Sequence, residues 1–440
     1  MKTTLGMAAA ATGGVLHADA ATTYVSVVID SRAAEPGALF VALPGERVDG
    51  HDFAESACAA GAVAVVVERP VAVPHVLVPD AVRALAALAT AHRDRLTAQV
   101  VGVTGSAGKT STKDLLGAIL AESGPTVAPP GSYNNDLGAP LTVLRADELT
   151  RHLVVEMGAR AVGDVARLCA MARPTTAVVL NVGSAHLGEF GSREAIAVAK
   201  GELVDAATDL AVLNADDPLV AAMSSRARAE IRTFGMAGDV RAEGLQLDSH
   251  GRPSFRLVAP EGGTPVRMLL IGAHQVSNAL AAATVGLAVG LSVEVVGAAL
   301  NRARPASRWR MEVTETPEGV TVINDAYNAN PESMRAALDA LVAMDAVRHL
   351  AVLGPMAELG DGAEEAHAVV ADYARSLGVH RLIAVAAPDY GADADVADVS
   401  AAAAMLSAEL RRGDAVLVKA SRAAGLERLA ARLVRQDDPS

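Results

Sequence analysis

The chain has 440 residues, of which 51% are hydrophobic but only 2% aromatic, and it carries a formal net charge of −13. This length exceeds one compact core and predicts two to four domains, and the shortage of aromatic residues favours layered α/β cores built from Ala, Val and Leu. The acidic balance argues against wholesale binding to nucleic acid or anionic membranes, yet it allows an anionic ligand held by a local cluster of donors.

The first twenty residues contain one lysine, a small apolar stretch and an Ala-x-Ala ending, and they resemble a secretory signal. Because Thr12, Gly13 and Gly14 interrupt the apolar run, we expect instead a short surface helix that ends at the two glycines. No stretch is long and apolar enough to span a bilayer. Cys58 and Cys169 show no metal-binding pattern, so we expect two buried thiols in a reducing, cytoplasmic setting.

The first of three sections, residues 1–97, alternates short strands with helices. This alternation predicts a small α/β domain. The predicted strands are 24–32, 38–43, 62–68 and 75–79, and an alanine-rich helix follows over 80–95.

The second section, residues 98–305, contains short apolar strands between helical segments, which predicts a mostly parallel sheet covered on both faces. The third section, residues 306–440, repeats this alternation and predicts a Rossmann-like doubly wound domain. The overall fold class is therefore α/β with three domains. In the second section the predicted strands are 99–104, 152–158, 176–183, 210–216 and 263–272, with a helix over 273–290.

The stretch 100–116, VVGVTGSAGKTSTKDLL, has the strand, glycine turn and helix start of a phosphate-binding loop. Its spacing is unusual, because the first glycine of G-x-x-x-x-G-K-[ST] would fall at Val103, and the nearest glycines are Gly102 and Gly105. The Gly-Lys-Thr-Ser run around Lys109 nevertheless favours a variant phosphate loop over a turn with a solvated lysine. We therefore expect ATP as the ligand.

Three further polar residues lie where such sheets bind ligands. Glu156 ends a buried strand and His186 follows the next one, both at the carboxyl edge of the sheet, and Lys200 lies on the following helix. Each alone has a plain alternative, namely a surface ion pair for the glutamate and a solvated side chain for the other two.

Together with the phosphate loop, these residues resemble the Mur ligase family. The resemblance covers all three sections in the family's order, and the further stretches narrow it to the members that join D-alanyl-D-alanine to a UDP-N-acetylmuramoyl-tripeptide. Ala107, Leu180 and Ala420 depart from the family pattern, but none of them removes a charged or metal-binding group. The stretches that carry the resemblance are ALPGERVDGHDF, SYNNDLGAPLTVL, GAHQVSNALAA, RWRMEV, NDAYNANPESM, LGPMAELGD and VLVKASR.

The resemblance implies roles for the matching residues, with ATP as co-substrate and two Mg²⁺ ions. Lys200 would be carbamylated, because an oxygen anion can bind Mg²⁺ whereas an ammonium group cannot. The implied ATP-binding residues are Gly105, Ser106, Ala107, Gly108, Lys109, Thr110, Ser111, Asn278, Arg310 and Asp325. The implied metal ligands are Thr110, Glu156, His186 and Lys200, and the implied catalytic residues are Lys109, Glu156, His186 and Lys200. The implied substrate-binding residues are Ser31, Arg32, Arg47, Asp49, Asn134 and Asn135.

The implied reaction passes through an acyl phosphate on the tripeptide's terminal carboxylate, which the amine of D-alanyl-D-alanine then attacks. We expect a monomer whose third domain closes over the second to exclude water. Two alternatives remain open. One is a related ligase that adds another amino acid, although the stretch NDAYNANPESM and the absence of a clear Asp-Asn/Asp-Pro-Arg motif disfavour it. The other is a phosphate-loop switch, which would have no use for Glu156, His186 and Lys200 together.

Overall fold

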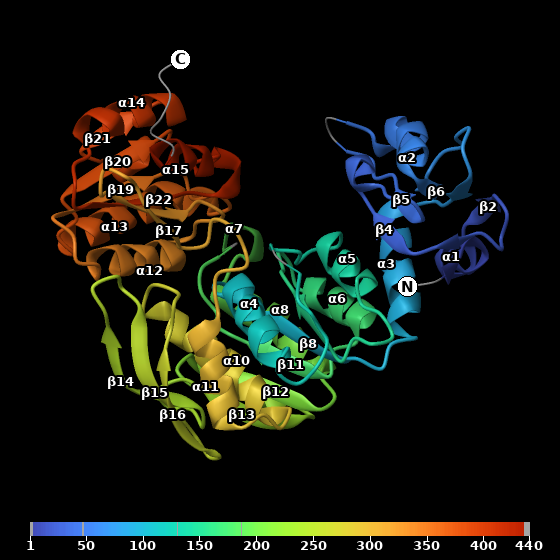
Figure 1. The fold of residues 1–440 in the computed structure, drawn as a ribbon, viewed down its shortest axis with the longest axis horizontal. Coiled ribbons are helices and arrows are strands. Elements are labelled where there is room, and N and C mark those ends of the chain that lie inside the picture. Colours follow the sequence, from blue (N-terminus) through green and yellow to red (C-terminus); the bar gives the residue numbers. More distant parts are fainter. Residues whose placement is uncertain (1–2, 46–47, 130, 186, 435–440) are drawn as a thin grey trace.

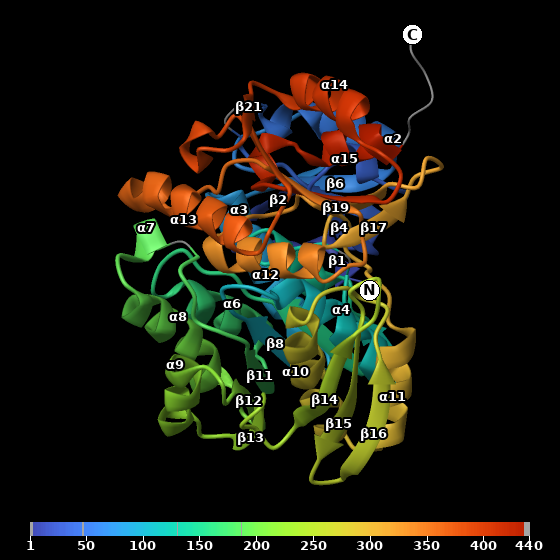
Figure 2. The same ribbon diagram turned by 90° about the vertical axis from the view of Figure 1, so that its left-hand side faces the viewer.

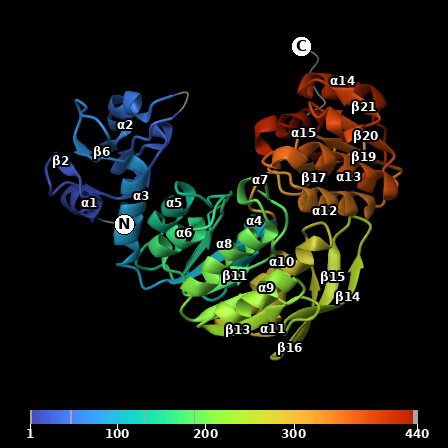
Figure 3. The ribbon, with the colours of Figure 1, turned by 180° about the vertical axis from the view of Figure 1, so that it is seen from behind.

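The computed structural model describes residues 3–45, 48–129, 131–185 and 187–434, and it contains three α/β units (Figure 1). Each unit is built on its own sheet, and the expected α/β fold class is confirmed. The two outer units contact different parts of the central unit, as Figures 1 and 3 show. No helix in the described part of the chain is long and apolar enough to cross a membrane.

The N-terminal unit contains a five-stranded sheet with the order β2-β7-β6-β5-β4, in which only β2 is antiparallel to its neighbour. A two-stranded pair, β1 with β3, lies beside α1. The strands are β1 (Thr3–Thr4), β2 (Val15–His17), β3 (Thr23–Tyr24), β4 (Ser26–Val28), β5 (Ala38–Val41), β6 (Ala62–Val67) and β7 (His75–Leu77). The helices are α1 (Leu5–Thr12), α2 (Ala54–Ala60) and α3 (Ala81–Arg93).

The first helix, α1, ends where the glycines predicted. The Thr4 hydroxyl accepts the Met7 N–H at 3.2 Å at one end, and Gly13 adopts the left-handed conformation with φ 66° at the other. Leu5 is fully buried, so one side of this helix belongs to the core. The expectation of two buried thiols is only half right, because Cys169 is buried but Cys58 is partly exposed.

The long helix α3 joins the N-terminal unit to the central one (Figure 1). Asp80 caps it by accepting the Arg83 N–H at 2.9 Å, and Leu85 and Leu88 are buried on its apolar face. At its other end, Arg93 donates to the carbonyl oxygen of Ala172 at 3.0 Å. The N-terminal unit is thus fixed to the central unit through packed helices and polar contacts.

The central sheet has six parallel strands in the order β13-β12-β11-β8-β10-β9. Its middle strands are buried on both faces, as their uninterrupted apolar runs predicted. The strands are β8 (Gln99–Thr104), β9 (Thr126–Val127), β10 (His152–Glu156), β11 (Thr176–Val179), β12 (Leu210–Asn214) and β13 (Glu230–Phe234). The helices are α4 (Lys109–Leu120), α5 (Gly138–Leu144), α6 (Asp164–Ala172), α7 (Leu187–Phe190), α8 (Arg193–Ala206), α9 (Pro218–Ala221), α10 (His274–Ala288) and α11 (Val293–Arg302).

A three-stranded antiparallel sheet follows the central one and was not predicted. It consists of β14 (Arg241–Leu247), β15 (Pro253–Ala259) and β16 (Gly262–Arg267). The strand predicted over 263–272 was wrong in its second half, because β16 ends at Arg267. Phe255 and Leu257 are buried while Arg256 is exposed, so this sheet is half-buried and alternates where the parallel strands are continuously apolar.

The C-terminal unit has the sheet order β17-β18-β22-β19-β20-β21, parallel except for β17, with an apolar core on each face. The predicted doubly wound unit is therefore confirmed. Its helix α12 lies over β14 and β15 in Figures 1 and 2, and the Asp345 N–H donates to the Ser249 carbonyl oxygen at 2.8 Å. The strands are β17 (Glu312–Glu315), β18 (Thr321–Asp325), β19 (Arg348–Leu353), β20 (Arg381–Val385), β21 (Ala394–Val396) and β22 (Asp414–Lys419). The helices are α12 (Pro331–Val342), α13 (Ala363–Ser376), α14 (Val399–Glu409) and α15 (Glu427–Val434).

Two buried histidines, His92 and His152, are expected to make the stability of the fold depend on pH. His152 on β10 is fully buried and neither ring nitrogen has a hydrogen-bond partner among the described residues, and burial lowers its pKa and that of His92. Because the folded-state pKa lies below the unfolded value of about 6.5, the stabilising contribution is complete above that pH and is lost as the pH falls. We expect the melting temperature to fall between about pH 7 and about pH 5, and His152→Leu to reduce this slope. Thermal unfolding followed by circular dichroism at each pH checks this, and an unchanged slope in the variant would contradict it.

Candidate active site

The phosphate loop connects β8 to α4 at the carboxyl edge of the central sheet. Gly102 lies within β8, so Gly105 is the loop's first glycine. Gly108 has φ +83°, and a Cβ atom there would lie 2.3 Å from Oδ1 of Asn278, so only glycine fits. The helix α4 begins without a side-chain cap. Its first-turn N–H groups and its dipole therefore make an anion-binding site.

Lys109 folds back over this loop. Its Nζ donates to the carbonyl oxygen of Gly105 at 2.7 Å. Burial lowers the pKa of Lys109, the Glu156 carboxylate opposes this shift and Arg310 adds to it. The segment that follows β11 also holds the loop, because Asn181 Oδ1 accepts the Ala107 N–H at 2.9 Å. A cation is thus held beside an anion-binding helix start.

Glu156, at the end of β10, is the polar centre of the site. Its carboxylate accepts hydrogen bonds from the Thr110 hydroxyl at 3.0 Å, the Ser132 hydroxyl at 3.0 Å and the Asn134 amide at 2.9 Å. It is only 2% exposed. The Glu156 carboxylate and the two hydroxyl oxygens beside it are oxygen ligands of the kind that Mg²⁺ prefers, so they fit such an ion, although the described residues hold no group of three or more His, Cys, Asp or Glu side chains that could bind a metal.

Lys200 lies on α8 and is 4% exposed. Burial lowers its pKa well below the usual range, and the nearby charge of Lys109 lowers it further. Because the positive charges of Lys109 and Lys200 repel each other, it is unfavourable for both side chains to be charged at once. This environment therefore makes the neutral amine of Lys200 easier to form than it is in water.

The C-terminal unit contributes Arg310 to the same site. Its guanidinium donates to the Thr110 hydroxyl at 3.2 Å and lies 4.3 Å from the ring centroid of Tyr327. An arginine from the third unit therefore reaches the first turn of the helix that carries the phosphate loop.

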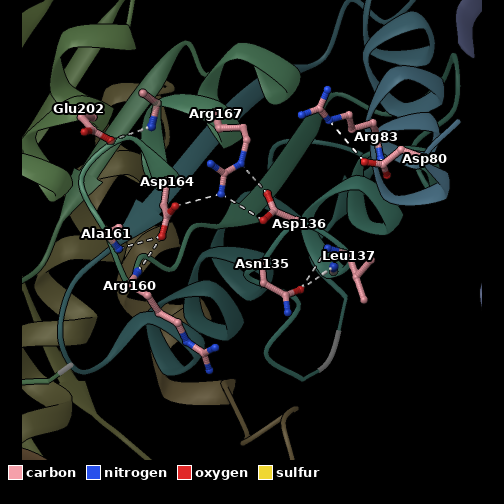
Figure 4. Close-up of polar contacts among 12 residues, drawn as sticks. Asp80, Arg83, Asn135, Asp136, Leu137, Arg160, Ala161, Asp164, Arg167 and Glu202 are labelled. Atoms are coloured by element: carbon pink, nitrogen blue, oxygen red, sulfur yellow. Dashed lines mark hydrogen bonds and ion pairs between the residues drawn. The ribbon is translucent and has the colours of Figure 1, made fainter. Parts of the chain in front are cut away.

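The phosphate loop, Glu156 and Arg310 line a cavity of about 650 Å³ between the central and C-terminal units, whereas Lys200 is not among its lining residues. On the central side, Arg167 of α6 pairs with Asp136 and Asp164, and Asn135 Oδ1 accepts the Leu137 N–H (Figure 4). Residues lining the cavity include Ser106 to Ser111, Ser132, Asn134, Asn135, Glu156, Arg160, Arg310, Tyr327, Asn330, Glu358 and Arg422.

Three of the predicted ATP-binding residues, Gly105, Asn278 and Asp325, are not among the residues that line this cavity. Asn278 is buried beneath the phosphate loop, where its Oδ1 accepts the Thr112 hydroxyl at 3.3 Å. Asp325 ends β18 and forms a buried ion pair with Lys419 at 2.5 Å. In this structure both side chains support the loops around the cavity.

Three of the substrate-binding residues predicted in the first unit, Ser31, Arg32 and Asp49, are not among the residues that line the cavity. Ser31 begins a 3₁₀ turn (Ser31–Ala33), and the neighbouring Arg32 is exposed and paired with Asp30. Asp49 is occupied by local contacts, because it accepts the His51 N–H at 2.9 Å. Two further predicted residues, Arg47 and His186, lie outside the described residues.

Three family models match the chain in succession. The description "Mur ligase family, catalytic domain" matches residues 23–105, "Mur ligase middle domain" residues 103–286, and "Mur ligase, glutamate ligase domain" residues 309–438. The chain belongs to the Mur ligase family.

Several relatives of this Mur ligase share a name. The UDP-N-acetylmuramoyl-tripeptide–D-alanyl-D-alanine ligase of Mycobacterium tuberculosis is 49% identical, over 94% of this chain and 92% of its own length. The ligase of that name in Escherichia coli is 36% identical over 92% of each chain.

Solved structures agree with this placement. MurF from Acinetobacter baumannii superposes with a TM-score of 0.89 at 33% identity, covering 99% of both chains. MurF from Thermotoga maritima in complex with ADP gives 0.82 at 32% identity, covering 93% of this chain and 97% of its own. The Mur ligase resemblance inferred from the motifs is therefore confirmed.

Several site residues of this Mur ligase were not predicted from the sequence. Ser132 donates to Glu156, Tyr327 stacks on Arg310, and Arg167 lies in the cavity wall. Ser132 and Tyr327 lie inside the motifs SYNNDLG and NDAYNAN, which gave a signal. No motif contains Arg167, and nothing in the sequence reveals which face of α6 turns toward the cavity.

Proposed function

We propose that this Mur ligase joins D-alanyl-D-alanine to the terminal carboxylate of UDP-N-acetylmuramoyl-tripeptide at the expense of ATP, giving the pentapeptide precursor in the cytoplasm. The observation that carries the proposal is the contact between Thr110, at the start of the phosphate-loop helix, and Glu156 at the end of β10, which neighbours β8 in the sheet. This contact supports the proposal, because it would bring bound nucleotide and a cation to the same cavity wall.

The chemistry starts from a carboxylate that cannot react with an amine directly, because its leaving group would be an oxide. A carboxylate oxygen attacks the γ-phosphorus, the bond from that phosphorus to the bridging oxygen breaks, and ADP leaves. The amine nitrogen then attacks the carbonyl carbon, the amide bond forms, and inorganic phosphate leaves with the amine proton released. Lys109 and the N–H groups of the phosphate loop stabilise the charge that builds up on the phosphoryl oxygens.

Two Mg²⁺ ions complete the proposed site, where they supply charge neutralisation between the two anionic reactants. Thr110, Glu156 and His186 would hold them, together with Lys200 as a carbamate. The lowered pKa of Lys200 supports this, because only a neutral amine can attack carbon dioxide and lose a proton to form the carbamate. The product is an anion with the oxygen ligands that Mg²⁺ requires.

The remaining proposed roles follow the three sections of the chain. Residues 1–97 would bind the UDP-sugar through Ser31, Arg32, Arg47 and Asp49. Residues 98–305 would bind ATP through Gly105 to Ser111 and Asn278, and the peptide through Asn134 and Asn135. Residues 306–440 would contribute Arg310 and Asp325 and close over the second domain to exclude water. We expect the chain to act as a monomer.

Phosphate release tests this function. We expect ADP and phosphate to form at the full rate only when ATP, the UDP-tripeptide and D-alanyl-D-alanine are all present, since the amine must consume the acyl phosphate. A coupled phosphate assay with each component omitted, and with single amino acids replacing the dipeptide, measures this. Equal turnover with another amino acid would identify a related ligase instead, and phosphate release without any acceptor would indicate a simple nucleotide hydrolase.

A further inference from the structure

A buried ion pair lies one helical turn beyond the phosphate loop and takes no part in the chemistry above. On α4, Lys113 Nζ lies 2.8 Å from Asp114 Oδ1, and the two side chains are only 2% and 7% exposed. Charges this deeply buried are costly unless hydrogen bonds satisfy them. Their partners therefore show what the pair holds in place.

Those partners come from two other segments. Lys113 Nζ donates to the carbonyl oxygens of Pro129 at 2.5 Å and Gly131 at 3.0 Å, and to the Ser307 hydroxyl at 3.3 Å. Asp114 accepts the Ser307 N–H at 2.9 Å and its hydroxyl at 3.1 Å. The same hydroxyl accepts the Gly131 N–H at 2.9 Å, so the one donor and both acceptor positions of this hydroxyl are used.

Each of the three segments reaches a wall of the cavity within a few residues. Lys113 and Asp114 lie one turn after Lys109 and Thr110 on the same helix. Gly131 begins the substrate loop, residues 131–136, in which Ser132 bonds Glu156. Ser307 lies in the linker between the second and third units, three residues before Arg310.

We propose that Lys113, Asp114 and Ser307 are positioning residues, which hold the substrate loop and Arg310 in register with the phosphate loop so that acceptor, nucleotide and third domain align together. The proposal rests on the ligase activity given above. Because Ser307 lies in the linker to the third domain, a movement of that domain would shift the substrate loop through these hydrogen bonds. A shift of about 1 Å between reacting groups is enough to lower the rate greatly.

The decisive variant is Ser307→Ala, which removes one hydroxyl and leaves the ion pair. Turnover is measured as kcat per nucleotide-binding site, with those sites counted by calorimetric titration with ADP. We expect kcat to fall about tenfold or more and the KM for the UDP-tripeptide to rise, while the Kd for ADP stays within about twofold. Lys113→Met is expected to have a larger effect of the same kind, and the serine variant decides if this one does not fold.

The matched control is Arg302→Ala, which breaks the exposed ion pair between Arg302 and Glu122 beyond the other end of α4. It should leave all three constants within about twofold. A serine variant whose kcat per nucleotide site stays within about threefold of the wild type would overturn the proposal, as would an equal loss in the control. Failure of the wild type to turn over would instead contradict the ligase function.

Discussion

Replacing Lys200 with alanine is expected to lower kcat about a thousandfold or more with little change in melting temperature. The side chain is buried, and its lowered pKa indicates that the folded protein gains little from its charge. If the carbamate supplies an oxygen anion to the site, alanine removes a catalytic charge rather than a packing element. Steady-state kinetics and thermal unfolding of the purified variant measure both effects.

Rescue distinguishes the carbamate from other roles for Lys200. A short-chain carboxylate such as acetate or propionate should restore part of the activity of Lys200→Ala, because it places an oxygen anion in the space that the side chain leaves. Val198→Ala, on the same helix at an exposed position, should neither lose activity nor respond to the added acid. Full activity of Lys200→Ala without any carboxylate would rule out the carbamate.

Glu156→Gln is expected to lower kcat about a hundredfold to a thousandfold and to raise the Mg²⁺ concentration needed for half-maximal activity. The change keeps the shape of the side chain but removes its negative charge, and three neighbouring donors now bond that carboxylate. Kinetics as a function of Mg²⁺ concentration separate the loss of the ion from the loss of the fold.

The control for this change is Glu230→Gln, a similar substitution at a side chain that is 65% exposed on the edge strand β13. It should leave both the rate and the Mg²⁺ requirement unaltered. If Glu156→Gln kept the wild-type Mg²⁺ dependence while losing rate, the glutamate would act on the substrate directly and the proposed cation site would be wrong.

The parallel sheets were predictable because strands that are buried on both faces consist of short apolar runs, as in residues 99–104 and 210–216. The antiparallel sheet was missed because its strands are only half-buried. In β15, Arg256 is exposed between the buried Phe255 and Leu257, and a single such alternation carries less signal than a continuous run.

The site was predictable where function depends on local sequence. Gly108 and Lys109 are constrained by the turn and helix start that they form, so a short motif identifies them. The Lys113–Asp114 pair was not predictable, because its partners at Pro129 and Ser307 lie far along the chain and only the packed fold brings them together. Contacts between domains carry no periodicity that a single sequence displays.

An ¹⁸O label in the acceptor carboxylate tests the proposed acyl phosphate directly. The UDP-tripeptide is prepared with ¹⁸O in its terminal carboxylate, and the phosphate released during one round of synthesis is analysed by mass spectrometry. If that carboxylate attacks the γ-phosphoryl group of ATP within the cavity, each phosphate released carries one ¹⁸O atom. Phosphate without ¹⁸O, formed alongside the pentapeptide, would show that the two reactants never form the acyl phosphate and would contradict the account.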